Sequence, residues 1–221
     1  MPPQGGNSEL AAPSDRERVI SGDCNAGPPL PGFAPYFEPG HRDAFARYWQ
    51  ARPNAAAAEA AVGGDLEALA ESMGAFMQST GASDISARAF SERALRMLAG
   101  LFDSKVRNQC LDEEGIAGEV IFSDGFVENH APFSDSMDSG GQLFGSRKSW
   151  PFELRLAGAR AYNRWLAEFC NQSAARRAGV ILLPPAHDPK LLIAEMTRAR
   201  EAGLRGGVLV PPLDVGLPGY H

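Results

Sequence analysis

Four short apolar runs recur along the chain and predict the strands of a sheet. Each run ends in Gly, Pro, Asp or Ser, and the four occupy 19–23 (VISGD), 118–125 (GEVIFSDG), 178–185 (AGVILLPP) and 206–212 (GGVLVPP). Apolar and polar positions do not alternate within them, a pattern typical of parallel strands that are covered on both faces. The pattern therefore predicts four buried, parallel strands.

Helical patterns occupy the segments between these runs. In 152–172, apolar or small residues recur at the spacing of one helix face, which we expect to pack on the sheet: Leu154, Gly158, Tyr162, Trp165 and Phe169. After the third run, Asp188 is placed to cap a helix that begins at Pro189 and ends at Gly203. Alternating strands and helices predict an α/β protein built from right-handed βαβ units.

The connection between the first two strands, at about 41–114, is far longer than one crossover helix. It predicts a helical insertion with a break at Gly63 and Gly64, and its helical patterns lie near 41–51, 55–79, 84–100 and 103–114. We expect residues 1–17 to form a disordered tail and residues 18–221 to form one domain that contains the insertion.

Charge and composition narrow the range of partners. The formal net charge of -6 argues against a nucleic acid or an anionic membrane as partner, because phosphates and acidic headgroups repel an acidic surface. No segment reaches the roughly 18 consecutive apolar residues that cross a bilayer, and no apolar signal segment opens the sequence. Three scattered cysteines without a CxxC motif argue against a disulfide framework. We therefore expect a cytoplasmic protein.

Two polar side chains at the end of the first run are candidates for binding a ligand. Asp23 and Asn25 are two apart, so on a regular strand they would project the same way. They would then meet at the carboxyl-terminal edge of the sheet, where parallel α/β folds bind ligands. A competing interpretation is a turn, because Asp or Asn beside Gly and Pro often bonds its own backbone.

Cys24, between these residues, allows a third interpretation. The segment Gly22–Ala26 resembles a nucleophile elbow of the G-x-[SC]-x-[GA] type. Such an elbow needs a helix directly after the nucleophile, and the prolines of the following GPPLPGFAP segment oppose that helix. A cysteine hydrolase is therefore a weaker hypothesis than a turn.

His130 is a candidate for contact with a substrate. It lies in the long loop after the second strand, 123–151, and hence on the ligand-binding side of a parallel sheet. None of the four histidines stands in an HxH or HExxH motif, and no GxGxxG or GxxxxGK[ST] motif supports nucleotide binding.

Three segments together resemble the amidohydrolase-related family, in its aminocarboxymuconate-semialdehyde decarboxylase-like branch. They are VISGDCNAGPPLPGFAPYFEPGHRDAF (19–45), LDEEGIAGEVIFSDG (111–125) and the block from RAYNRW to GGVLVPP (160–212). In that family the first strand ends in D-x-H, and an aromatic, proline-rich loop leads to a Y.P..RD segment. Here Asn25 stands where the family has histidine.

The resemblance implies a metal-dependent hydrolase or decarboxylase that acts on a small organic acid. It implies a divalent metal, zinc or a similar ion, with Asp23 and Asn25 as the first-strand ligand pair. The implied fold is the N-terminal half of a TIM (β/α)8 barrel, because the family's remaining ligands lie on strands beyond the fourth. We therefore expect a truncated enzyme that is weak or inactive alone.

An alternative from another class is a non-catalytic binding or assembly protein derived from this family. An open half-barrel leaves strand edges unpaired and an apolar face exposed, and both favour association. The expected partners are a small-molecule substrate, a second copy of the chain, or a complementing C-terminal half.

Overall fold

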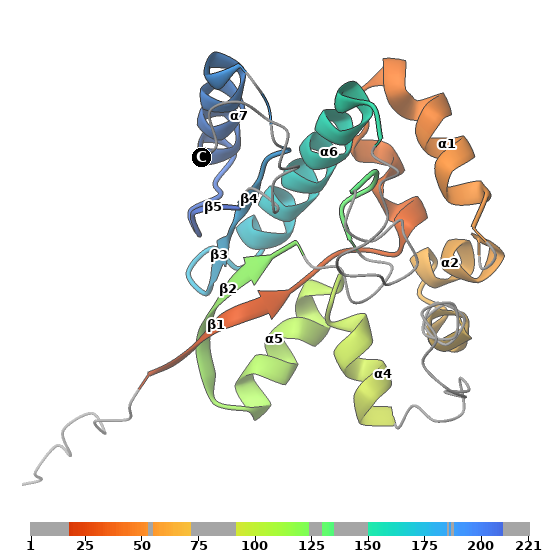
Figure 1. Ribbon diagram of the computed structural model, residues 1–221. Coiled ribbons are helices and arrows are strands. Elements are labelled where there is room, and N and C mark those ends of the chain that lie inside the picture. Colours follow the sequence, from red (N-terminus) through yellow and green to blue (C-terminus); the bar gives the residue numbers. More distant parts are fainter. Residues whose placement is uncertain are drawn as a thin grey trace, which may run out of the picture.

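Helices surround a small sheet of parallel strands in the computed structural model (Figure 1). The structure describes residues 18–52, 55–71, 92–123, 130–134, 150–184, 186 and 188–209. It confirms the α/β class. The predicted tail at 1–17 lies outside the described residues, as do large parts of the loop at 123–151 and of the insertion.

The strands form two groups that share one extended segment. The first group has the order β1-β2-β3, and the second pairs β4 with β5, all in parallel. The strands are β1 (Val19–Asn25), β2 (Ile116–Phe122), β3 (Arg177–Gly179), β4 (Ile181–Leu182) and β5 (Val208–Leu209). The predicted third strand, 178–185, is thus divided into β3 and β4.

Backbone hydrogen bonds join the two groups across this segment. The amide of Val180, which separates β3 from β4, donates to the carbonyl of Ile121 over 2.8 Å. On the other side, the amide of Gly206 donates to the carbonyl of Gly179 over 2.8 Å. The four predicted strands therefore lie side by side in the order in which they occur along the chain.

The helices alternate with the strands as the sequence predicts. The insertion between β1 and β2 contains most of them, α6 joins β2 to β3, and α7 joins β4 to β5. Their bounds are η1 (Leu30–Tyr36), η2 (Pro39–His41), α1 (Arg42–Gln50), α2 (Ala55–Val62), α4 (Glu92–Ala99), α5 (Ser104–Glu113), α6 (Phe152–Asn171) and α7 (Pro189–Glu201). Residues 66–71 are also helical, so the predicted break at Gly63 and Gly64 is confirmed.

α7 has the ends that its sequence predicts. The Asp188 side chain accepts a hydrogen bond from the amide of Lys190 over 2.9 Å, and Pro189 opens the helix. Gly203 follows the last turn with φ 112°, a left-handed conformation that side chains with a Cβ adopt only with strain.

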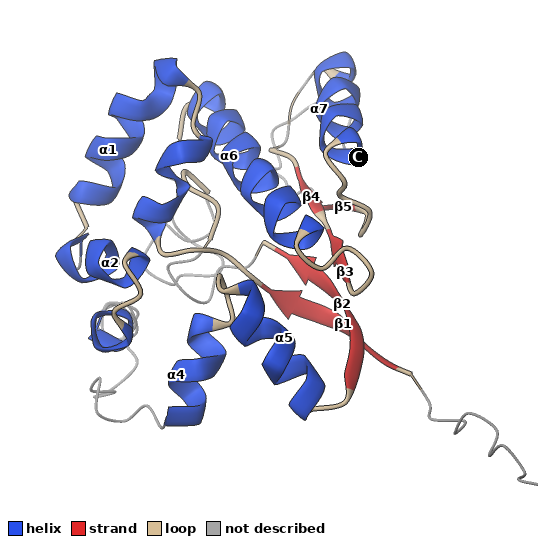
Figure 2. Cartoon of the chain, turned by 180° about the vertical axis from the view of Figure 1, so that it is seen from behind, coloured by secondary structure: helices blue, strands red, loops and turns tan. Residues whose placement is uncertain are grey.

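α6 lies between α1 and α7 (Figure 2) and supplies the centre of the core, where most residues of its predicted face are buried. Tyr162 and Leu166 are fully buried, and Trp165 stacks on Phe169 with 5.1 Å between ring centroids. The Tyr162 hydroxyl donates to the carbonyl of Ala26, directly after β1, over 3.1 Å. α6 therefore fixes the segment that leaves the carboxyl end of β1.

The prediction that all four strands are buried is wrong for the outer two. Val19 and Ile20 of β1 are 53% and 65% exposed, and Val208 of β5 is 45% exposed, whereas Ile121 of β2 is fully buried. The side chains of β1 are exposed because it lies at the edge of the sheet: within the described residues, β2 is its only neighbouring strand. A continuous apolar run does not reveal whether its strand is central or at an edge.

Candidate functional site

The first candidate site is the carboxyl-terminal end of β1. β1 extends through Asn25, two residues beyond the predicted end at Asp23, so Asp23 lies in the strand and not in a turn. Cys24 pairs with Ile121 and Asn25 with Phe122, the last residue of β2. Asp23 is exposed and Asn25 is half-buried. The two predicted ligands therefore lie within the strand, at the edge where parallel sheets bind ligands.

A register shift in β1 changes the geometry of this pair. Ser21 pairs with Glu119 and Cys24 with Ile121, so β1 uses one residue more than β2 between these positions. The prediction that Asp23 and Asn25 project the same way assumed unbroken alternation. Their joint action on one ligand therefore stays a prediction.

Cys24 lacks the surroundings of an activated nucleophile. Its thiol donates to the Ser21 hydroxyl over 3.0 Å, and burial raises its pKa above the ordinary value of 9.0. The residues after β1 are irregular as far as η1, a 3-10 helix that begins at Leu30, so no α-helix begins directly after the cysteine. The structure gives the cysteine-hydrolase hypothesis no support.

His130 lies in a buried polar and aromatic cluster. Its imidazole is 1% exposed, and its Nε2 is 3.4 Å from the hydroxyl of Tyr48 on α1. Arg52, just beyond α1, donates to the same hydroxyl over 2.8 Å and lies 4.8 Å from the centroid of the Tyr48 ring. Phe133 and Trp150 pack on Tyr48, with centroids 4.5 and 5.5 Å away. His130 therefore contacts the insertion as well as its own loop.

Asp23 and Asn25 supply oxygen ligands, which hard divalent cations prefer to softer imidazole or thiolate ligands. Among the residues that the structure describes, no group of three or more His, Cys, Asp or Glu side chains could hold a metal ion. The described residues therefore complete no cation site, and a ligand role for Asp23 and Asn25 stays a prediction.

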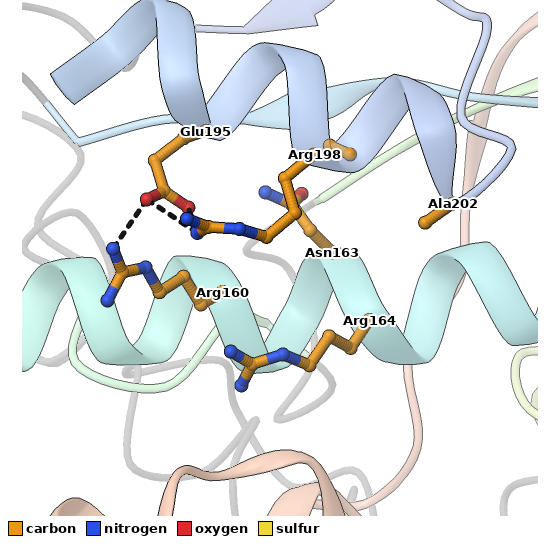
Figure 3. Close-up of a pocket in the computed structure, with 7 residues that line it drawn as sticks. Arg160, Asn163, Arg164, Glu195, Arg198 and Ala202 are labelled. Carbon is orange, nitrogen blue, oxygen red and sulfur yellow. Dashed lines mark hydrogen bonds and ion pairs between the residues drawn. The ribbon is translucent and has the colours of Figure 1, made fainter. Parts of the chain in front are cut away.

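A pocket of about 40 Å³ lies between α6 and α7 (Figure 3). Two of its arginines converge on one carboxylate: Arg160 donates to Glu195 over 2.5 Å, and Arg198 donates to the same carboxylate over 2.7 Å. Arg164, also on its wall, bonds Glu38 over 2.6 Å. The pocket is small and each arginine on its wall pairs with a carboxylate, so we interpret it as the ionic contact between two helices rather than a ligand site.

Sequence reasoning missed the partners of His130. Tyr48 lies on α1 and Arg52 follows four residues later, just beyond the helix end at Gln50; this spacing brings side chains together at a helix end. Nothing in the sequence relates them to a histidine 82 residues further along the chain.

Comparisons with known proteins give no match to a family model, a curated protein or a solved structure. The resemblance to the amidohydrolase-related family therefore stays a prediction from the sequence. Within the described part of the chain, none of the helices combines the length and apolar character that a membrane-spanning helix requires.

Proposed function

We propose that this chain supplies the first four strands of a barrel-type, metal-dependent hydrolase or decarboxylase that acts on a small organic acid. The order of the strands is the observation that supports the proposal. The strands lie side by side in chain order, all parallel, with α6 and α7 as crossovers. Consecutive βα units of a barrel have this order, whereas the order of a doubly wound sheet reverses at an internal strand.

The proposed site is the carboxyl-terminal edge of this sheet. Asp23 and Asn25 would be the first two ligands of a divalent cation, and His130 would contact the substrate. A cation held there would supply Lewis-acid chemistry, namely polarisation of a carbonyl or carboxylate oxygen of the substrate and stabilisation of its developing charge. The further ligands would come from later strands, provided by a complementing segment or chain.

A second candidate is a non-catalytic protein that assembles through its sheet edge. The exposed β-branched side chains of Val19 and Ile20 favour it, because an apolar edge strand pairs readily with another chain. The partner would be a second copy or a complementing half-barrel. Light scattering of the purified chain tests this candidate, since a strict monomer that also binds no complementing half would contradict it.

Zinc titration of matched variants tests the proposed site. Imidazole is a better zinc ligand than an amide, so we expect Asn25→His to bind zinc at least about 10-fold more tightly than the wild type. Asp23→Ala in the Asn25→His background should remove that gain. Asp43→Asn, which alters an exposed carboxylate on α1, is the control. Equal zinc affinity in all variants would contradict the assignment of Asp23 and Asn25 as a ligand pair.

A further inference from the structure

The loop that carries His130 is held in a strained backbone conformation. Phe133 has φ 58°, the only positive φ of a non-glycine residue in the described chain. A left-handed conformation costs a residue such as phenylalanine on the order of 1 kcal/mol or more. Phe133 is nevertheless fully buried, with its ring packed edge-on against Phe37 and Phe45. Packing therefore maintains a conformation that the local sequence does not favour.

A second contact fixes the same loop against α6. The carbonyl oxygen of Pro132 lies 1.9 Å from the position that a Cβ on Gly158 would occupy. Only glycine at 158 allows this approach of loop and helix. The loop is thus placed from two sides, by the aromatic cluster of the insertion and by the glycine of α6.

The hydrogen bonds at Tyr48 have a preferred direction. A guanidinium can only donate, so Arg52 occupies a lone pair of the Tyr48 hydroxyl oxygen. Its positive charge drives the hydroxyl hydrogen to the far side of the oxygen and strengthens the hydroxyl as a donor. His130 Nε2 lies 3.4 Å from that oxygen and can accept. An Nε2 that accepts has no hydrogen, which leaves the ring proton on Nδ1.

We infer that Tyr48 and Arg52 are positioning residues that hold His130 as its Nδ1–H tautomer. The inference deepens the proposed function, on which the substrate contact of His130 rests: with Nε2 accepting from Tyr48, the fixed tautomer makes the ring a donor at Nδ1, the polarity that contact with an acid substrate requires. The strained loop, which is held from two sides, serves the same purpose. It fixes the position of the His130 ring, and Tyr48 and Arg52 fix which ring nitrogen carries the proton.

Nitrogen NMR of the full chain, labelled with 15N-histidine and free of metal and substrate, tests the inference. At about pH 8.5 an ordinary imidazole is neutral, and correlations to the ring hydrogens distinguish protonated from unprotonated nitrogen. His130→Gln identifies the signals of His130. We expect Nδ1 protonated and Nε2 unprotonated in the wild type. In Tyr48→Phe, the 15N chemical shifts of both ring nitrogens should move toward the average values of an imidazole that exchanges between its two tautomers.

Matched variants separate positioning from general stability. Arg52→Lys keeps a cationic donor and should preserve the population of the Nδ1–H tautomer. Arg52→Met removes the donor and should lower that population. Tyr36→Phe removes a hydroxyl that bonds Glu168 and should leave His130 unchanged. If Tyr48→Phe does not fold, the comparison of the two Arg52 variants decides. A protonated Nε2 in the wild type, or identical His130 signals in Arg52→Met and wild type, would overturn the inference. The zinc titration fails or succeeds independently of this measurement.

Discussion

Glu119 and Arg177 form an ion pair with both side chains completely shielded from solvent, and 3.2 Å separates Oε1 of Glu119 from Nε of Arg177. Arg107 of α5 donates to the other carboxylate oxygen over 2.6 Å. The Arg177 guanidinium lies 4.2 Å from the centroid of the Phe169 ring, and its remaining hydrogens bond Ser104, Asn108 and the Phe169 carbonyl. One buried cluster thus joins β2, β3, α5 and α6.

Replacing the carboxylate of this cluster should destabilise the protein strongly. Glu119→Ala leaves the buried Arg177 without its counter-ion, and breaking a buried pair in this way costs about 3–5 kcal/mol. Urea denaturation measures the loss. Glu113→Ala, which breaks an exposed pair with Arg96, is the control and should barely move the urea midpoint. Equal midpoints for the two variants would contradict a buried, stabilising role for Glu119.

A methyl group at Gly158 should displace the His130 loop. In Gly158→Ala the new Cβ overlaps the Pro132 carbonyl, and overpacking of this kind costs about 1–3 kcal/mol. Thermal denaturation measures the effect. Gly40→Ala is the matched control, because a Cβ at that position meets no atom within 4 Å. Wild-type stability in Gly158→Ala would mean that the loop does not lie against α6.

The ionic contact between α6 and α7 should make the stability of the protein depend on pH in the acidic range. Burial raises the pKa of Glu195, but hydrogen bonds from Arg160 and Arg198 outweigh it, so the pKa falls below the ordinary 4.5. The unfolded chain then takes up its proton at higher pH than the folded chain. The contribution is complete above about pH 5 and is lost as pH falls through the folded-state pKa.

The pH dependence of the urea midpoint measures this contribution. Between about pH 6 and pH 3, Glu195→Gln should show a shallower fall than the wild type, because it removes the group whose protonation is linked to unfolding. Glu153→Gln, at the exposed first turn of α6, should retain the wild-type slope. A wild-type slope in Glu195→Gln would show that another carboxylate controls the acid sensitivity.

Cys24 should react slowly with thiol reagents. Because burial raises its pKa above 9.0, little thiolate is present near neutral pH. Alkylation by iodoacetamide, followed by peptide mass spectrometry, should show a pH midpoint above 9 and faster reaction in urea. A midpoint near or below 7 would indicate an activated thiolate and return the cysteine nucleophile to consideration.

Local chemistry made the helices predictable. The break at Gly63 and Gly64, the cap at Asp188 and the buried face of α6 follow from backbone conformation and from the period of the helix. Each of these signals lies within a few residues of the feature that it specifies. The parallel α/β class is predictable for the same reason, since runs of apolar residues alternate with helical patterns.

The sequence by itself determined the alternation of helices and strands, the cap of α7 and the buried face of α6. Tertiary structure alone decided that β1 lies at an edge, that a register shift precedes Cys24, and that Tyr48 and Arg52 meet His130. The physical reason is the sequence separation of the interacting residues, because helix capping and hydrophobic periodicity depend on residues that are close together in the chain. Exposure, strand register and a hydrogen bond over 82 residues depend on how distant segments pack.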